Sequence, residues 1–232
     1  MVTNAVIGKG SVGFAAAARV NQSLTAGAEK RLLVWMAERA PRWVTSDGLT
    51  ALGLSAQVGA GFCYALARWD RRALALGIVF IVLNWLGDSL DGTLARVRRQ
   101  QRPRYGFYVD HVVDIFGSAA LLGGLAVSGL VHGWVAAAML VAFLLLAGES
   151  YLATHTLGRF EMSHGWFGPT ELRILLIAAN LRLLHRSWIT VLGHRWLLFD
   201  VGGMAGAAGM LAMAAVVTAR HTAQLYREEP LP

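Results

Sequence analysis

The sequence predicts an all-α integral membrane protein with six transmembrane helices and an amphipathic helix at the membrane surface before them. Of its 232 residues, 56% are hydrophobic and only 15% are charged, whereas a typical soluble domain carries about 25% charged residues. The apolar residues gather in six long runs, and arginines cluster at the ends of those runs. This distribution is typical of helices that cross a bilayer.

The first expected helix lies in residues 24–44, after a polar stretch at residues 1–23 that we expect to be poorly ordered. Apolar residues such as Leu32 and Trp35 alternate there with charged residues. The pattern indicates a helix lying in the membrane interface with its apolar face toward lipid. An ordinary helix packed on the rest of the domain is the alternative. Pro41 ends the pattern.

Six apolar segments of 19 to 26 residues follow. Each is long enough to cross about 30 Å of hydrocarbon at a rise of about 1.5 Å per residue. They are expected at about residues 49–68, 73–96, 106–131, 134–157, 169–187 and 197–221. Pro169 lies in the first turn of the fifth segment, where proline is favourable. The segments together define a six-helix domain over residues 45–222, followed by a C-terminal tail at 223–232.

The net charge of +7 comes from arginines beside the apolar runs. It therefore indicates contact with anionic lipid headgroups, and no nucleic-acid partner is expected. With six spans, both termini lie on one side of the membrane. Five arginines in residues 96–104 and four basic residues in 30–42 predict that this side is cytoplasmic. The single cysteine, Cys63, excludes an intrachain disulfide.

Four aspartates lie where the second and third segments meet. They are Asp88, Asp91, Asp110 and Asp114. A carboxylate at membrane depth costs about 2.5–3.5 kcal/mol on insertion scales, so such residues are functional candidates. Asp88 and Asp91 share one helical face, and Asp110 and Asp114 continue a column that begins at Gly106. Because a short linker joins the two helices, both acidic faces can converge.

Carboxylates clustered without histidine or cysteine suit hard divalent cations such as Mg²⁺ or Mn²⁺. Two such ions would neutralise the four charges and clamp a phosphoryl group. Gly92 leaves room for a ligand, and Arg96 offers a forked donor to phosphate. Before the first span, Ser46 or Asp47 can cap the helix, whose N-terminal amides would also suit an anion.

The acidic stretch resembles the signature of the CDP-alcohol phosphotransferases, a family of six-helix membrane enzymes of phospholipid synthesis. The matching pattern is Asp88-x2-Asp91-Gly92-x2-Ala95-Arg96-x9-Gly106-x3-Asp110-x3-Asp114. Every signature residue is present, and the resemblance extends over about residues 24–222. It implies transfer of a substituted phosphate group from a CDP-linked donor, CDP-diacylglycerol or a CDP-amino alcohol, to an alcohol acceptor, with release of CMP. A homodimer is one option for the assembly.

The resemblance also implies residue roles. It makes the four aspartates ligands of two divalent metal ions, Mg²⁺ or Mn²⁺, and makes Asp114 the general base as well. Gly92 and Arg96 would contact the CDP group. A second set of CDP contacts would precede the first span and comprises Thr45, Ser46, Asp47 and Gly48. The family often has proline in the place of Ser46.

Candidates for the acceptor site lie later in the chain. Glu149 and Glu171 loosely resemble elements of choline and ethanolamine phosphotransferases, and they would favour a cationic amino alcohol. Arg173 and Arg182 would instead favour a phosphorylated acceptor such as glycerol or inositol phosphate.

A rival interpretation of the acidic cluster is a divalent-cation transporter, which would move metal without releasing CMP. No inverted repeat is visible, and Arg96 suits an anion; both observations count against transport.

Overall fold

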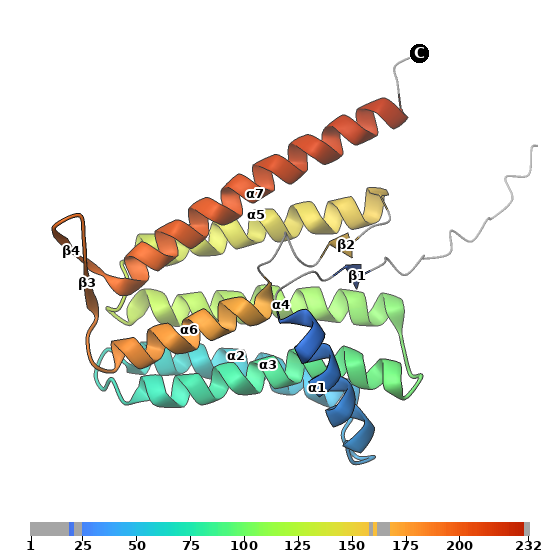
Figure 1. Ribbon diagram of the computed structural model, residues 1–232, viewed down its shortest axis with the longest axis horizontal. Coiled ribbons are helices and arrows are strands. Elements are labelled where there is room, and N and C mark those ends of the chain that lie inside the picture. The colour runs from blue at the N-terminus through green and yellow to red at the C-terminus, as the bar shows by residue number, and fades with distance from the viewer. Residues whose placement is uncertain (1–18, 21–24, 158–159, 162–167, 230–232) are drawn as a thin grey trace, which may run out of the picture.

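The computed structural model describes residues 19–20, 25–157, 160–161 and 168–229, so the disorder expected for residues 1–23 lies almost entirely outside the described chain. The described residues form seven helices and two pairs of short strands (Figure 1). The helices are α1 (Ala26–Arg39), α2 (Ser46–Leu66), α3 (Ala73–Val97), α4 (Pro103–Val127), α5 (Gly133–Leu157), α6 (Pro169–Leu183) and α7 (Leu198–Glu228). The strands are β1 (Arg19–Val20), β2 (Phe160–Glu161), β3 (Trp188–Val191) and β4 (His194–Leu197).

Five helices are long and apolar enough to cross a membrane, namely α2, α3, α4, α5 and α7. The prediction of an all-α membrane protein is therefore confirmed. The count of six spans stays a prediction, because α6 has 15 residues and is about 22 Å long, less than the hydrocarbon thickness. Figure 1 shows α6 beginning partway along the bundle. The last helix, α7, continues to Glu228, beyond the end expected at residue 221.

Helix α6 ends at Leu183, four residues before the end expected for the fifth segment, and a hairpin follows between the fifth and sixth expected segments. Strands β3 and β4 pair antiparallel across a two-residue turn. Leu192 and Gly193 occupy this turn with φ of 50° and 81°. Positive φ at both central residues is the geometry of tight hairpin turns, and Gly193 adopts it without steric cost.

Helix α2 packs closely on both α3 and α4, and glycines allow the close approach. A Cβ added to Gly87 of α3 would lie 2.6 Å from the backbone nitrogen of Gly53 in α2. A Cβ on Gly124 of α4 would collide with the backbone oxygen of Gly61 in α2. Small residues at these crossings let helices approach closely in a bilayer, where close packing replaces the hydrophobic effect as the force between helices.

The main hydrophobic core lies at the end of the bundle next to the hairpin. It is built from Tyr64, Leu74, Val135, Leu183 and Phe199, of which Leu74, Val135 and Leu183 are fully buried. A smaller cluster lies at the other end, under α1, where Leu33 and Ala37 pack against Leu90 and Leu94 of α3.

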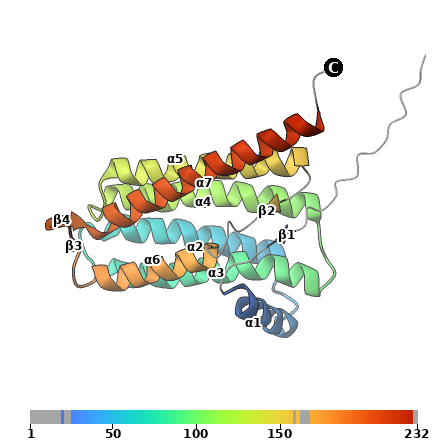
Figure 2. The same cartoon turned by 45° about the horizontal axis from the view of Figure 1, so that its top comes forward.

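Helix α1 lies across α3, outside the layers of long helices (Figure 2). Its buried face packs on α3, while Leu32 and Trp35 on the other face are 46% and 54% exposed. The two interpretations of this helix are therefore compatible, since one face packs on the domain and another presents apolar side chains outward.

Arg98, at the end of α3, fixes the α1–α2 connection by donating hydrogen bonds to the carbonyls of Ala40, Pro41 and Val44 at 2.5–2.9 Å.

Candidate functional site

A cleft of about 240 Å³ opens between the start of α2, the end of α3, the linker after α3 and the start of α4. It brings together residues that are far apart in the sequence. The expected site residues that line it are Ser46, Asp47, Asp91, Gly92, Arg96 and Asp110. The acidic faces of α3 and α4 thus converge beside the N-terminus of α2, as the short linker predicts.

Asp91 is the buried member of the acidic group, with 6% of its surface exposed. Its carboxylate accepts a hydrogen bond from the Thr50 hydroxyl at 2.6 Å and another from the backbone N–H of Gly92. The Ser46 hydroxyl donates to the backbone oxygen of Asp91 at 3.0 Å. Ser46 and Thr50 are one helical turn apart on α2, so this helix holds the Asp91 backbone and side chain together.

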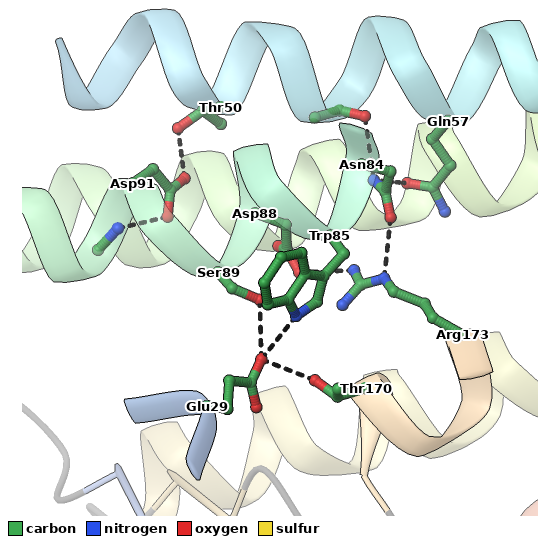
Figure 3. A network of polar contacts seen from close by, with 12 residues as sticks. Glu29, Thr50, Gln57, Asn84, Trp85, Asp88, Ser89, Asp91, Thr170 and Arg173 are labelled. Atoms are coloured by element: carbon green, nitrogen blue, oxygen red, sulfur yellow. Dashed lines mark hydrogen bonds and ion pairs between the residues drawn. The ribbon is translucent and has the colours of Figure 1, made fainter. Parts of the chain in front are cut away.

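Asp88 lies one turn before Asp91 on α3 and is paired with Arg173 of α6 (Figure 3). The Nη2 of Arg173 is 2.6 Å from Oδ2 of Asp88, and its Nε donates to Oδ1 of Asn84 at 3.0 Å. The arginine predicted for the acceptor site therefore reaches the acidic face of α3.

The four aspartates are close enough to act on one another electrostatically. Asp91 experiences the charges of Asp88 and Asp110. Asp114, which is half-buried on α4, experiences the charges of the other three aspartates and of Arg173. Like charges gathered at low dielectric repel, so cations must compensate them. Arg173 supplies a positive charge to Asp88, and Arg96 lines the same cleft as Asp91 and Asp110.

The donor chemistry of this group fits a hard divalent cation, because every candidate ligand is a carboxylate oxygen. The part of the chain that the structure describes contains no compact group of three or more Asp, Glu, His or Cys side chains that could hold a metal ion. Asp88 accepts a hydrogen bond from Arg173, and Asp91 accepts one from Thr50. Carboxylates that bind metal ions are commonly held by such hydrogen bonds, so these contacts are compatible with metal binding.

The residues expected to contact CDP before the first span have separate roles. Thr45, rather than Ser46 or Asp47, caps α2, because its hydroxyl accepts the N–H of Gly48 at 3.0 Å. Ser46 and Asp47 line the cleft. Asp47 pairs with Arg102 of the linker, and the Arg102 guanidinium lies 4.1 Å from the ring centre of Tyr105.

The two glutamates expected at the acceptor site are bound to other protein groups. Glu149 accepts a hydrogen bond from His221 of α7 at 2.6 Å. Glu171 accepts hydrogen bonds from the backbone and hydroxyl of Thr25, at 3.0 and 2.7 Å, and from the backbone of Gly168 at 2.9 Å. Burial alone would raise the pKa of Glu171, but these hydrogen bonds outweigh it and hold the pKa below its ordinary value. Both glutamates therefore take part in contacts between segments that are distant in the sequence.

Several residues of the site were not predicted from the sequence. Glu29 of α1 accepts hydrogen bonds from Trp85 at 2.8 Å, Ser89 at 3.3 Å and Thr170 at 2.8 Å (Figure 3), so one carboxylate connects α1, α3 and α6. Thr50 and Asn84 contact the acidic group and its arginine directly. Neither residue belongs to a recognisable motif. The only feature of the sequence that distinguishes Asn84 is that it is a polar residue within an apolar run.

Comparison with known proteins gives a family and two relatives. Residues 43–220 match the sequence model described as CDP-alcohol phosphatidyltransferase. An archaetidylinositol phosphate synthase of Pyrococcus horikoshii is 31% identical over 120 residues, which are 52% of this chain and 57% of that relative. An uncharacterized protein of Aquifex aeolicus is 30% identical over 145 residues, 61% of this chain and 68% of that protein. The match thus spans little more than half the length of the first relative.

Proposed function

Because the chain belongs to the CDP-alcohol phosphatidyltransferase family, we propose that it is a membrane transferase of phospholipid synthesis. It moves a substituted phosphate group from a CDP-linked donor to an alcohol acceptor and releases CMP. The observation that carries this proposal is the cleft, where Asp91 and Asp110 meet Gly92 and Arg96. Carboxylates, a small residue and a forked cation side by side suit a diphosphate accompanied by divalent cations.

The family is generally metal-dependent. We assign Asp88, Asp91, Asp110 and Asp114 as the ligands of two divalent ions, Mg²⁺ or Mn²⁺. When bound, the ions neutralise the diphosphate and stabilise the charge that develops as its bond breaks. Removal of divalent ions with a chelator should abolish turnover, and Mg²⁺ or Mn²⁺ should restore it.

The protein's own groups perform the remaining steps. Arg96 donates hydrogen bonds to the diphosphate, and Gly92 lets the ligand approach the helix backbone. Ser46 and Asp47, with the α2 N-terminus, contribute further contacts to the CDP group. Asp114 accepts the proton of the acceptor hydroxyl as the acceptor oxygen bonds to the β-phosphorus of the donor. The bond between that phosphorus and the bridging oxygen breaks, and CMP leaves with the oxygen.

For the acceptor, the contacts favour a phosphorylated alcohol over an amino alcohol. Arg173 brings a cation to the acidic group at Asp88, whereas the contacts of Glu149 and Glu171 are with His221 and Thr25, outside that group. A guanidinium fork matches a phosphate group. The name of the Pyrococcus relative also contains a phosphorylated inositol lipid. We therefore propose an acceptor such as inositol phosphate or glycerol phosphate, used with a CDP-linked lipid as donor.

The test offers purified protein radiolabelled CDP-diacylglycerol, CDP-choline and CDP-ethanolamine with a panel of phosphorylated and unphosphorylated alcohols. We expect CMP release from the CDP-linked lipid with a phosphorylated acceptor. Release with an amino-alcohol donor alone would overturn the acceptor assignment. Divalent-cation flux into proteoliposomes without CMP release would favour the rival transporter.

We also propose that the cleft faces the cytoplasm, because the arginine-rich linker at residues 96–104 forms part of this end of the bundle. Gln100 is an exposed position in this linker. In a Cys63→Ala background, Gln100→Cys should react with a membrane-impermeant maleimide only after the cells are permeabilised. Labelling of intact cells would reverse the orientation.

A further inference from the structure

Asn84 is a buried polar residue in the apolar part of α3, one turn before Asp88, with 8% of its surface exposed. Its side-chain amide donates to the backbone oxygen of Gly53 at 3.0 Å and to Oε1 of Gln57 at 3.4 Å. Both acceptors belong to α2. Its Oδ1 faces the opposite way and accepts the Nε–H of Arg173 at 3.0 Å (Figure 3).

The chemistry of the carboxamide makes this arrangement directional. The amide nitrogen only donates and the oxygen only accepts, so anchoring the nitrogen to α2 points the oxygen toward α6. The close approach of α2 and α3 at Gly53 and Gly87 brings the Gly53 carbonyl within reach.

The guanidinium of Arg173 is planar, so a hydrogen bond at Nε fixes the plane in which its other donors lie. One of these donors, Nη2, is the group that meets Asp88 at 2.6 Å. The orientation of the arginine at the acidic face therefore depends on a residue that does not line the cleft.

We propose that Asn84 is a positioning residue: anchored to α2, it holds the Arg173 guanidinium at the angle required to bind the phosphate of the acceptor. The inference rests on the proposed function, and it adds a specificity determinant outside the signature. Asn84 acts on the acceptor through Arg173 and makes no contact with the CDP-linked donor.

Steady-state kinetics of CMP release separate this role from a general structural one. Asn84→Ala should raise the KM for a phosphorylated acceptor about tenfold, since a small misplacement of a binding group costs up to about 10²-fold. The KM for the donor should stay within about twofold. In an Arg173→Ala background, Asn84→Ala should have no further effect on the acceptor KM, because the residue through which it acts is absent.

Asn180 provides the matched control. It is a fully buried asparagine on α6, at the end of the bundle remote from the cleft, and it donates to the Tyr64 hydroxyl at 2.9 Å. Asn180→Ala should leave both KM values unchanged. If Asn84→Ala raises both KM values equally, or if its effect persists without Arg173, the positioning role is wrong. Should Asn84→Ala not fold, Gln57→Leu removes one anchor and should shift the acceptor KM in the same direction by less.

A binding measurement keeps the inference separate from the reaction. Inorganic phosphate should protect Arg173 from modification by phenylglyoxal, read by mass spectrometry of the peptide that contains it. Asn84→Ala should require about tenfold more phosphate for equal protection. This pattern without CMP release from any donor would overturn the proposed function and support the positioning role. Equal protection in both proteins would overturn the positioning role, whatever the turnover.

Discussion

At the end of the bundle next to the β3–β4 hairpin, the main apolar core holds the helices together, whereas at the cleft end a smaller apolar cluster is supplemented by networks of polar side chains. Leu74, Val135 and Leu183 are fully buried at the hairpin end. At the cleft end, Arg98 binds three carbonyls and Glu29 accepts three hydrogen bonds. The same chain thus uses two kinds of helix contact.

The difference matters because the two kinds of contact respond differently to a ligand. A close-packed apolar core has few alternative arrangements and resists change. Polar side chains can exchange partners or add a ligand, because a carboxylate such as that of Asp88 or Asp91 can make several polar contacts at once. The comparison predicts that substitutions of the acidic residues at the cleft change chemistry more than stability, and that substitutions in the packed core at the hairpin end do the reverse.

The largest expected effect is that of Asp114→Asn on turnover. The variant keeps the shape of the side chain but loses the charge that accepts the proton, and the loss of a general base alone costs up to about 10⁴-fold. We expect kcat to fall by at least about 10³-fold while binding of a CDP-linked donor persists. Removing one of four mutually repelling carboxylates should not lower the thermal stability in detergent.

Asp200→Asn is the matched control at the hairpin end. Asp200 is buried and accepts hydrogen bonds from the backbone and ring of His132 at 2.8 and 2.6 Å. Its substitution should lower stability and spare the turnover of the folded protein. Near-normal turnover of Asp114→Asn would refute the assignment of the base.

Gly124→Ala should have the largest effect on stability. A Cβ at this position would meet the backbone of Gly61, which cannot move as a side chain can. Overpacking of this kind costs about 1–3 kcal/mol, and we expect the upper end of that range. The adjacent Gly123→Ala meets no atom within 4 Å and should not destabilise the protein. Equal melting temperatures for the two variants would show that the α2–α4 contact is less tight than described.

Much of the fold could be predicted from the sequence because long apolar runs permit few structures in a membrane. Four of the five long helices lie within a few residues of the expected segments, and α7 begins as expected but ends seven residues later. The hairpin after α6 could not be predicted in this way, because Trp188–Val191 is too short a run to be identified as a membrane helix or as a strand by itself. Only pairing with His194–Leu197 across the Leu192–Gly193 turn makes it a strand.

The residues of the candidate site likewise differ in whether they could be predicted from the sequence. Asp91 and Asp110 lie on two consecutive helices joined by a short linker. Their convergence could therefore be predicted from residues that are close together in the sequence. Thr25 and His221, the partners of Glu171 and Glu149, lie 146 and 72 residues away, so neither the resemblance nor the charge of these glutamates indicated the contacts that they make. Asn84 was missed for the same reason, because its importance depends on where Gln57 and Arg173 are placed by helix packing.

Arg98→Ala tests whether a single polar side chain holds the α1–α2 connection. Charge-assisted hydrogen bonds to carbonyls contribute about 1.5–3 kcal/mol when buried, and partial exposure lowers this, so we expect a loss of about 2 kcal/mol. Cleavage by a protease at residues 40–45 should accelerate, and the KM for the donor should rise because Ser46 and Asp47 follow this connection. Arg99→Ala removes the same charge from an exposed neighbour and should be close to neutral. If the two variants lose the same stability, the loss would be due to the change in net charge and not to the three hydrogen bonds of Arg98.

Glu29→Gln should have the smallest effect, and it tests how α1 is coupled to the cleft end. The variant keeps the oxygen that accepts from Trp85 and Thr170 but loses the charge that strengthens these bonds. We expect a loss of about 1 kcal/mol, seen as faster amide hydrogen exchange in α1 with no change in α5 or α7. Glu38→Gln, on an exposed position of the same helix, should leave exchange unchanged. If both variants accelerate hydrogen exchange in α1 equally, the hydrogen bonds of Glu29 do not hold this helix. The apolar contacts of Leu33 and Ala37 would then hold it, as apolar contacts do at the hairpin end.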